Sequence, residues 1–270
     1  MSNFWQRTIT GILFVLVLVA SIIIHPYLFS ALFLIISVLG LLEFNNIIKI
    51  QLSRIQYINT LVLGIIIYVD AFIINHFSLD PSWILIVLIP VILVFISELY
   101  RKTEQPFLNI GMTILSAVYV VMPFVFLVQL PYVKGDGYKY IIPLLFFSMV
   151  WINDTGAYLV GVSIGKRKLF PRISPKKSWE GFIGGIIFTL ILAYVVSFFT
   201  TDLVIVDLMV MALLISIFGT LGDLVESMLK RSHNIKDSGD LLPGHGGILD
   251  RFDALTFAAP LVYMYFVFFK

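Results

Sequence analysis

The sequence predicts an all-α, polytopic integral membrane protein with about nine transmembrane helices. Of its 270 residues, 60% are hydrophobic and 13% are charged, whereas globular proteins have about 45–50% apolar and about 25% charged residues. The mean hydropathy is +1.01, and a chain this small cannot hide so much apolar surface in a soluble core. These values exclude a soluble enzyme, a disordered chain and a collagen-like fold.

Nine apolar runs approach or reach the roughly 20 residues that a transmembrane helix needs. They cover residues 8–24, 27–43, 57–76, 81–97, 108–130, 140–161, 181–200, 204–228 and 249–269. Every run is continuous and lacks period-two alternation, which favours helices over the strands of a membrane barrel. No small-residue cleavage site follows the first run, so we expect a membrane helix there and not a signal peptide.

The basic residues predict the orientation of these helices. With the N-terminus in the cytoplasm, all but three of the 18 Lys and Arg residues fall in loops that would face the cytoplasm. The exceptions are Lys134, Lys139 and Lys270. Because basic residues gather in cytoplasmic loops, we expect nine spans, with the C-terminus on the outer side.

The chain divides by the character of its loops. Residues 1–135 would form about five spans with short loops, and residues 136–270 a catalytic region of about four spans with two long cytoplasmic loops. No internal repeat supports an inverted-repeat transporter. The absence of cysteine excludes thiolate nucleophiles and cysteine metal sites, and a net charge of +2 gives no reason to expect a nucleic-acid partner.

A polar stripe is predicted at the end of the eighth run. Asp223, Glu226, Ser227 and Lys230 are spaced i, i+3, i+4 and i+7, so they share one helix face, with Arg231 beside them. Ionisable residues at membrane depth usually mark a functional site. A snorkelling helix end would also explain the two basic residues, but it leaves the deeper Asp223 unexplained.

An irregular cytoplasmic loop at 232–247 follows, and the ninth run opens with Asp250 and Asp253. On one continuous helix these two acids, at i and i+3, would point the same way from the first turn. A helix N-terminus presents unpaired N–H groups and a partial positive charge. Gly246 and Gly247 would let a phosphate approach that backbone closely. Acids that only complement the helix dipole are the alternative interpretation.

Together, the two helix ends would form a site for a metal ion and phosphates. Three carboxylates would face one another there: Asp223, Asp250 and Asp253. Basic side chains would lie next to them: Lys230, Arg231 and Lys236. Oxygen ligands without cysteine suit magnesium or a similar hard cation. Such a cation beside phosphate-binding bases is the equipment of phosphoryl or nucleotidyl transfer.

The run from Ser227 to Asp253 resembles the signature of the phosphatidate cytidylyltransferases, or CDP-diacylglycerol synthases. The matching positions are Ser227, Lys230, Arg231, Lys236, Asp237, Gly239, Pro243, His245, Gly246, Gly247, Asp250, Arg251, Phe252 and Asp253. Two further segments, 153–166 and 174–181, look like parts of the same family, although Ser178 stands where many members have threonine. The resemblance covers roughly residues 150–255, and the first half of the chain matches only in being hydrophobic.

The resemblance implies that CTP and phosphatidate react to give CDP-diacylglycerol and diphosphate on the cytoplasmic face of a membrane, which we expect to be a bacterial plasma membrane. It implies Mg2+ held by Asp223, Asp250 and Asp253, with a second, monovalent cation (K+) nearby, and phosphate contacts from Lys230 and Arg231. It also suggests a homodimer. The catalytic residues would be Asp223, Lys230, Arg231, Asp250 and Asp253.

The remaining residues of the expected site would contact the substrates. They are Asp154, Lys176, Lys177, Ser227, Lys236, Asp237, His245, Gly246, Gly247 and Arg251. Asp154 either pairs with Lys166 or another basic neighbour, or contacts the nucleotide. Lys176 and Lys177 are expected to face CTP or phosphatidate, while the other bases of their loop suffice for topology and attraction to anionic lipid. His245 is expected to pack in its loop or bond a phosphate and not to act as a general base.

Two other functions remain open from the sequence. A CDP-alcohol phosphotransferase also gathers aspartates on membrane helices, but it would release CMP, and its longer aspartate-rich motif is absent. A cation-coupled transporter would use intramembrane acids as an ion path, but the acids here cluster toward one membrane face. No Walker or Rossmann nucleotide motif occurs in the chain.

Overall fold

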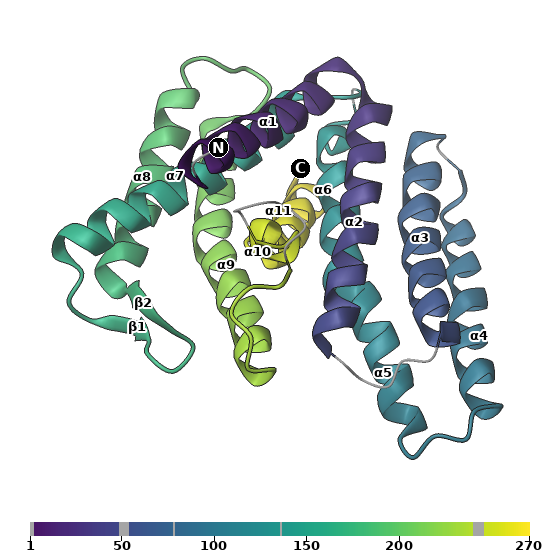
Figure 1. Cartoon of the computed structure of the whole chain (residues 1–270). Coiled ribbons are helices and arrows are strands. Elements are labelled where there is room, and N and C mark those ends of the chain that lie inside the picture. The colour runs from purple at the N-terminus through teal and green to yellow at the C-terminus, as the bar shows by residue number, and fades with distance from the viewer. Residues whose placement is uncertain (1–2, 49–53, 78, 136, 240–245) are drawn as a thin grey trace. The chain divides into compact units, whose positions relative to one another are not determined.

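The computed structural model describes residues 3–48, 54–77, 79–135, 137–239 and 246–270 and confirms an all-α, polytopic architecture (Figure 1). Within these residues, eight helices are long and apolar enough to cross a membrane. They are Pro26–Ile48, Arg54–Ile74, Pro81–Leu99, Pro106–Tyr132, Ile141–Ile164, Trp179–Val196, Ile205–Ser232 and Leu249–Phe269. The first predicted span is also helical, but its apolar part, Thr8–Ile24, is shorter. Nine spans and the sides of the termini therefore stay predictions.

Contacts divide the chain into two units. The first contains Met1–Gln129 and Asp237–Arg251, and the second contains Leu130–Lys236 and Phe252–Lys270. The character of the loops predicts a single boundary between two regions at residue 135. In the structure, the segment Asp237–Arg251 belongs to the same unit as the N-terminal helices. The functional division into an N-terminal and a catalytic region stays a prediction.

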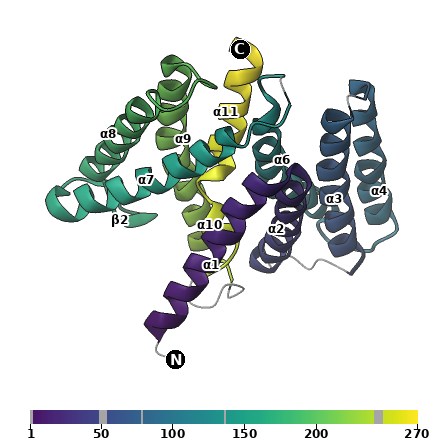
Figure 2. The same cartoon turned by 90° about the horizontal axis from the view of Figure 1, so that it is seen from above.

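In the first unit, α2 packs against α1, α3, α5 and α6. The elements of this unit are α1 (Asn3–Ile24), α2 (Pro26–Ile48), α3 (Arg54–His76), η1 (Pro81–Val87), α4 (Leu88–Leu99), α5 (Pro106–Ser116), the π-helical turn η2 (Ala117–Val121) and α6 (Met122–Gln129). The ring of Phe33 lies 5.1 Å from that of Phe29 and 5.7 Å from that of Phe124, and these aromatic contacts form part of the core. Figures 1 and 2 show α1 leaving α2 at a steep angle.

In the second unit, the long helix α9 contacts α7, α8 and α11. The elements are η3 (Leu130–Tyr132), α7 (Ile141–Ile164), β1 (Lys168–Phe170), β2 (Ser174–Ser178), α8 (Trp179–Val196), α9 (Ile205–Ser232), α10 (Leu249–Phe252) and α11 (Leu255–Phe269), with α10 divided by the boundary between the units. The apolar stretch that the sequence assigns to the ninth span is thus interrupted after Phe252.

Glycines let α7 and α8 approach closely. A Cβ built on Gly181 would lie 3.2 Å from the Cα atom of Gly161 and 2.7 Å from the carbonyl oxygen of Ala157. On Gly185, it would lie 2.6 Å from Oδ1 and 3.0 Å from the carbonyl oxygen of Asn153. Small residues at helix contacts are a common means of packing membrane helices, where lipid supplies little hydrophobic drive.

The basic loop between α7 and α8 forms an antiparallel hairpin, which the sequence did not predict. β1 pairs with β2 in a register that sets Lys168 opposite Ser178 and Phe170 opposite Ser174. The hydroxyl of Ser178 then accepts a hydrogen bond of 3.1 Å from the N–H of Gly181 and caps the N-terminus of α8. The hairpin therefore places Lys176 and Lys177 on a paired strand.

The three lysines expected on the outer side each pair with an acid. The Nζ atoms of Lys134 and Lys270 lie 3.4 and 2.9 Å from the buried carboxylate of Asp207, and Nζ of Lys139 lies 3.3 Å from Asp202. Asp207 begins α9, whereas the basic residues near Ser232 end it. These three lysines therefore lie near the start of α9, apart from the basic residues at its end, and the orientation of the chain in the membrane stays a prediction.

The glycine contacts between α7 and α8 predict the cost of adding one methyl group. Gly185→Ala should lower stability by about 1–3 kcal/mol, because the backbone of Asn153 cannot yield to the new Cβ. Gly111→Ala on α5 is the matched control, since its added Cβ meets nothing within 4 Å. Thermal unfolding of the detergent-solubilised protein measures both, and an unchanged melting temperature for Gly185→Ala would contradict the close packing.

Candidate active site

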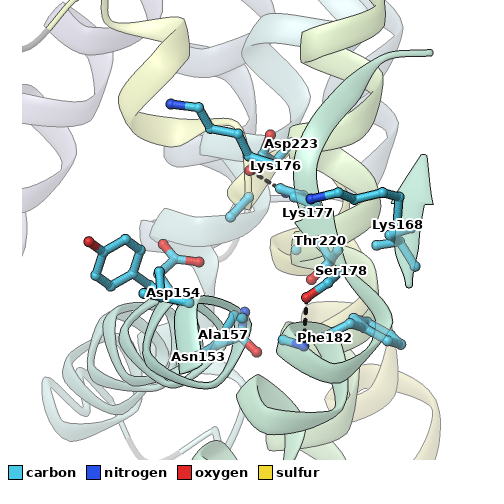
Figure 3. Close-up of a pocket in the computed structure, with 17 residues that line it drawn as sticks. Asn153, Asp154, Ala157, Lys168, Lys176, Lys177, Ser178, Phe182, Thr220 and Asp223 are labelled. Atoms are coloured by element: carbon cyan, nitrogen blue, oxygen red, sulfur yellow. Dashed lines mark hydrogen bonds and ion pairs between the residues drawn. The ribbon is translucent and has the colours of Figure 1, made fainter. Parts of the chain in front are cut away.

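The second unit contains a cavity of about 590 Å3, within the size range of small-ligand sites. Side chains from α7, both strands of the hairpin, α8 and α9 line it (Figure 3). The cavity therefore gathers residues from the two segments 153–166 and 174–181 and from the polar stripe of α9.

Charged groups form one wall of this cavity. Lys177 on β2 makes an ion pair and hydrogen bond with the carboxylate of Asp223 on α9. Asp154 enters from α7 and interacts electrostatically with both of these groups. Figure 3 shows Lys176 and Lys177 arriving from β2 and Asp154 from α7. Lys177 is thus a basic neighbour of Asp154 in the site, which fits the expectation of Lys166 or another basic neighbour, and a contact of Asp154 with the nucleotide stays a prediction.

Apolar side chains line another part of the same cavity. Tyr158 and Val162 on α7 are each 70% exposed, and Phe182 on α8 also lines the cavity. Exposed apolar side chains at a cavity suit contact with the hydrocarbon part of a ligand or with lipid. A ligand with a charged head and hydrocarbon chains would match both parts of the lining.

Two more carboxylates lie near the charged wall. Asp253, in the turn between α10 and α11, interacts electrostatically with Asp223, Glu226 and Lys177. A Cβ on Gly222 would come within 2.5 Å of the carbonyl oxygen of Asp253, so the turn lies directly against α9. The structure thus places two of the three predicted metal ligands, Asp223 and Asp253, in one cluster.

The α9 stripe forms as its spacing predicts. Ser227 donates a 3.3 Å hydrogen bond to Asp223, and Nζ of Lys230 lies 2.5 Å from Oε2 of Glu226. Lys230 and Glu226 are 8% and 1% exposed, so Lys230 is a buried ion-pair partner and not a solvated helix end. Glu226 belongs to the stripe that the sequence predicts but not to the predicted site, although its spacing of three residues from Asp223 is a sufficient signal.

The i, i+3 spacing predicts that Asp250 and Asp253 share a face of one continuous helix. The structure does not have that helix. α10 is only four residues long, and the chain turns at Asp253 before α11 begins. Oδ1 of Asp253 accepts a 2.6 Å hydrogen bond from the N–H of Ala254. This local bond competes with continuation of the helix, as aspartate side chains commonly do. Asp250 belongs to the first unit, and its approach to Asp223 and Asp253 stays a prediction.

The backbone amides beside Asp250 are already paired. Oδ2 of Asp250 accepts the N–H of Gly247 at 2.9 Å, and the N–H groups of Ile248 and Leu249 donate to Glu43 at 2.8 and 3.0 Å. The predicted phosphate contact through free amides at this helix start is therefore not what the structure shows. Gly246 has φ of +80°, which glycine adopts without strain. The assignment of Gly246 and Gly247 to substrate binding stays a prediction.

The other predicted contacts are at the surface. Arg231 is exposed and donates a 3.0 Å hydrogen bond to the carbonyl oxygen of Ile235, while Lys236, Asp237 and Arg251 are exposed. His245 lies outside the described residues. Their roles stay predictions.

No three acidic or histidine side chains among the described residues converge closely enough to hold a metal ion. Two of the acids near the cavity pair with lysines instead. Lys177 neutralises Asp223, and Lys230 neutralises Glu226. Carboxylate oxygens without sulfur still suit a hard cation, so the donor chemistry of the cluster fits magnesium.

The comparisons with known proteins cover both units. A model of the Cytidylyltransferase family matches residues 5–269. The chain belongs to this family. It is 36% identical over 263 residues to a phosphatidate cytidylyltransferase of Bacillus subtilis (strain 168), covering 96% of each chain. It is also 47% and 44% identical over 162 residues to phosphatidate cytidylyltransferases of Staphylococcus haemolyticus (strain JCSC1435) and Staphylococcus aureus (strain COL), covering 60% of each chain.

Membership in the cytidylyltransferase family makes the chain a nucleotidyltransferase. The family match also includes the N-terminal helices, for which the sequence resemblance provided no motif. The first unit is therefore part of what defines a cytidylyltransferase of this kind.

The ion pair in the cavity predicts unequal roles for bases of the same hairpin. Lys177→Gln should reduce cytidylyl transfer by about 100-fold, the range for loss of a preorganised electrostatic contact. Arg172→Gln is the matched control, because Arg172 is exposed in the same hairpin and does not line the cavity. Its activity should stay within about twofold of the parent, as expected for an ordinary surface change.

Activity would be measured as transfer of labelled cytidine nucleotide to lipid by the purified variants. Equal losses from Lys177→Gln and Arg172→Gln would show that only the net charge of the hairpin matters, and that the ion pair has no special role.

Proposed function

We propose that this chain is an integral membrane enzyme that converts CTP and phosphatidate to CDP-diacylglycerol and diphosphate. The named relatives support this substrate pair. The single structural observation that carries the proposal is the cavity of the second unit, where Lys177 and Asp223 lie in the same lining as Tyr158 and Val162. Such a lining suits a phosphate group whose acyl chains remain in the bilayer.

The reaction is a substitution at phosphorus. A phosphate oxygen of phosphatidate would attack the α-phosphorus of CTP, and the bond from that phosphorus to the oxygen bridging the α- and β-phosphates would break. Diphosphate would leave with the bonding electrons. The attacking phosphate is already an anion, so the site needs no strong base. Positioning and charge neutralisation are the main requirements of such transfers.

The residues of the cavity can meet these requirements. Lys177 would release Asp223 and contact a substrate phosphate, with Lys176 at the same edge. Asp154 would favour the cationic form of Lys177 through their charge interaction. Lys230, which Glu226 fixes in place, would keep a second positive charge close to the acidic cluster.

Magnesium fits the oxygen donors of Asp223 and Asp253, and we propose that these residues, together with Asp250, hold it. The bound ion would supply charge neutralisation for the phosphates of CTP. A monovalent cation such as K+ is a proposed second ion, and a homodimer is a proposed assembly.

We place the site at the cytoplasmic face of a bacterial plasma membrane. The hairpin and the end of α9 carry the basic residues, which favour that face. CTP would enter from the cytosol and phosphatidate from the side, along the lipid-exposed surface of α7.

The proposal predicts which products form. Purified protein with Mg2+, phosphatidate and CTP labelled in its base should yield a lipid-soluble cytidine product and diphosphate. Formation of CMP from CDP-diacylglycerol and an alcohol would instead indicate a phosphotransferase. Substrate flux in sealed vesicles without any need for CTP would indicate a transporter.

Asp223→Asn should lower this activity by about 100-fold or more, because it removes the negative charge that pairs with Lys177 and that is proposed to bind Mg2+. Asp202→Asn is the control, since Asp202 pairs only with Lys139 among the ion pairs described and lies near the other end of α9. Both variants should remain inserted in the membrane with similar melting temperatures. Near-normal turnover by Asp223→Asn would refute the assigned site.

A further inference from the structure

The N-terminal half contributes a buried carboxylate to the signature segment. Glu43 lies near the end of α2 and is 4% exposed. Its Oε1 accepts the N–H of Ile248 at 2.8 Å, and its Oε2 accepts the N–H of Leu249 at 3.0 Å. These partners are more than 200 residues away in sequence. The carboxylate thus caps the start of α10 from a distant helix.

The same network continues to Asp250. The hydroxyl of Ser238 lies 3.1 Å from Oε2 of Glu43 and 2.9 Å from Oδ2 of Asp250. A hydroxyl has a single proton to donate, so it can bond only one of the two carboxylates at a time. Oδ2 of Asp250 also accepts the N–H of Ser238 at 2.8 Å. Glu43 and Asp250 therefore share the Ser238 hydroxyl, and each accepts bonds from backbone amides of the same segment.

Gly239 and Gly247 pack closely against the carboxylate of Glu43. A Cβ on Gly239 would lie 2.8 Å from Oε1 of Glu43, and one on Gly247 would lie 2.5 Å from Oε2. A buried carboxylate is costly unless hydrogen bonds satisfy it, and bonds to a charged acceptor are stronger than neutral ones. Two amide bonds, with the Ser238 hydroxyl as a donor shared with Asp250, stabilise one conformation of the residues that bond Glu43.

We propose that Glu43 is a positioning residue for the transfer reaction, which fixes residues 247–250 so that Asp250 is held in one orientation. The inference rests on the proposed function, which gives Asp250 its role. It also assigns a purpose to the first unit, because α2 supplies the group that orders a segment of the family signature.

Glu43→Gln tests the proposal with almost no change in shape. The amide keeps one acceptor oxygen but replaces the other with an NH2 group, which would face the N–H of Leu249 or, with the amide turned over, the N–H of Ile248. Turnover should fall about 10- to 100-fold, as for loss of an outer partner of a functional carboxylate. The amides of Ile248 and Leu249 should exchange with deuterium at least about tenfold faster, while exchange in α9 stays unchanged.

Glu98→Gln is the matched control. Glu98 is 3% exposed in the same unit and bonds Arg101 and Thr103, away from the signature segment. Its turnover should remain near that of the parent. A double variant of Glu43→Gln and Ser238→Ala should lose little more than Glu43→Gln alone, since both changes act on one network.

Parent-like turnover of Glu43→Gln would overturn the proposal. So would a general rise in exchange through the first unit with equal losses from Glu98→Gln, because that pattern indicates only a structural role. If Glu43→Gln does not fold, Ser238→Ala decides: faster exchange at 247–250 with reduced turnover supports the proposal, and no change in either overturns it. A parent enzyme that forms no cytidine lipid would refute the proposed function, whereas the local exchange result would still report on Glu43.

Discussion

Carboxylates inside a largely apolar chain are the constraint on which this structure depends, because an ionised acid at membrane depth is costly without a partner. The protein meets this cost in two ways. Asp223 and Glu226 face the ammonium groups of Lys177 and Lys230, whereas Glu43 is satisfied by two backbone amides and a hydroxyl. In the proposed mechanism, the first arrangement exchanges a lysine for a substrate or an ion. Glu43 could bind a substrate or an ion only if its hydrogen bonds to Ile248, Leu249 and Ser238 were broken.

The sequence predicts the features that depend on local periodicity. Continuous apolar runs predict the spans, and spacing along α9 predicts the stripe that the Glu226–Lys230 and Asp223–Ser227 contacts confirm. The charge pattern predicts which lysines lie apart from the basic face, and the structure pairs each of them with an acid. The turn of a helix brings side chains three or four residues apart together, so these contacts can be predicted from a single sequence.

Features that depend on distant partners could not be predicted in the same way. Lys177 meets Asp223 across 46 residues, and Glu43 meets Ser238 across 195. Glu43 is a single acid near the end of an apolar run, and nothing in the neighbouring sequence indicates that it bonds the amides of Ile248 and Leu249. The break at Asp253 follows from a single bond to Ala254, which outweighs the tendency of an apolar run to continue as a helix.

The path of the chain between the two units has a consequence for how the signature segment is ordered. The polypeptide leaves the first unit at Leu130, re-enters it at Asp237 and departs again at Phe252. A polypeptide containing only the C-terminal half would retain the signature segment but would lack α2, which supplies the acceptor for the amides of Ile248 and Leu249. Neither half on its own therefore contains every group that orders this segment.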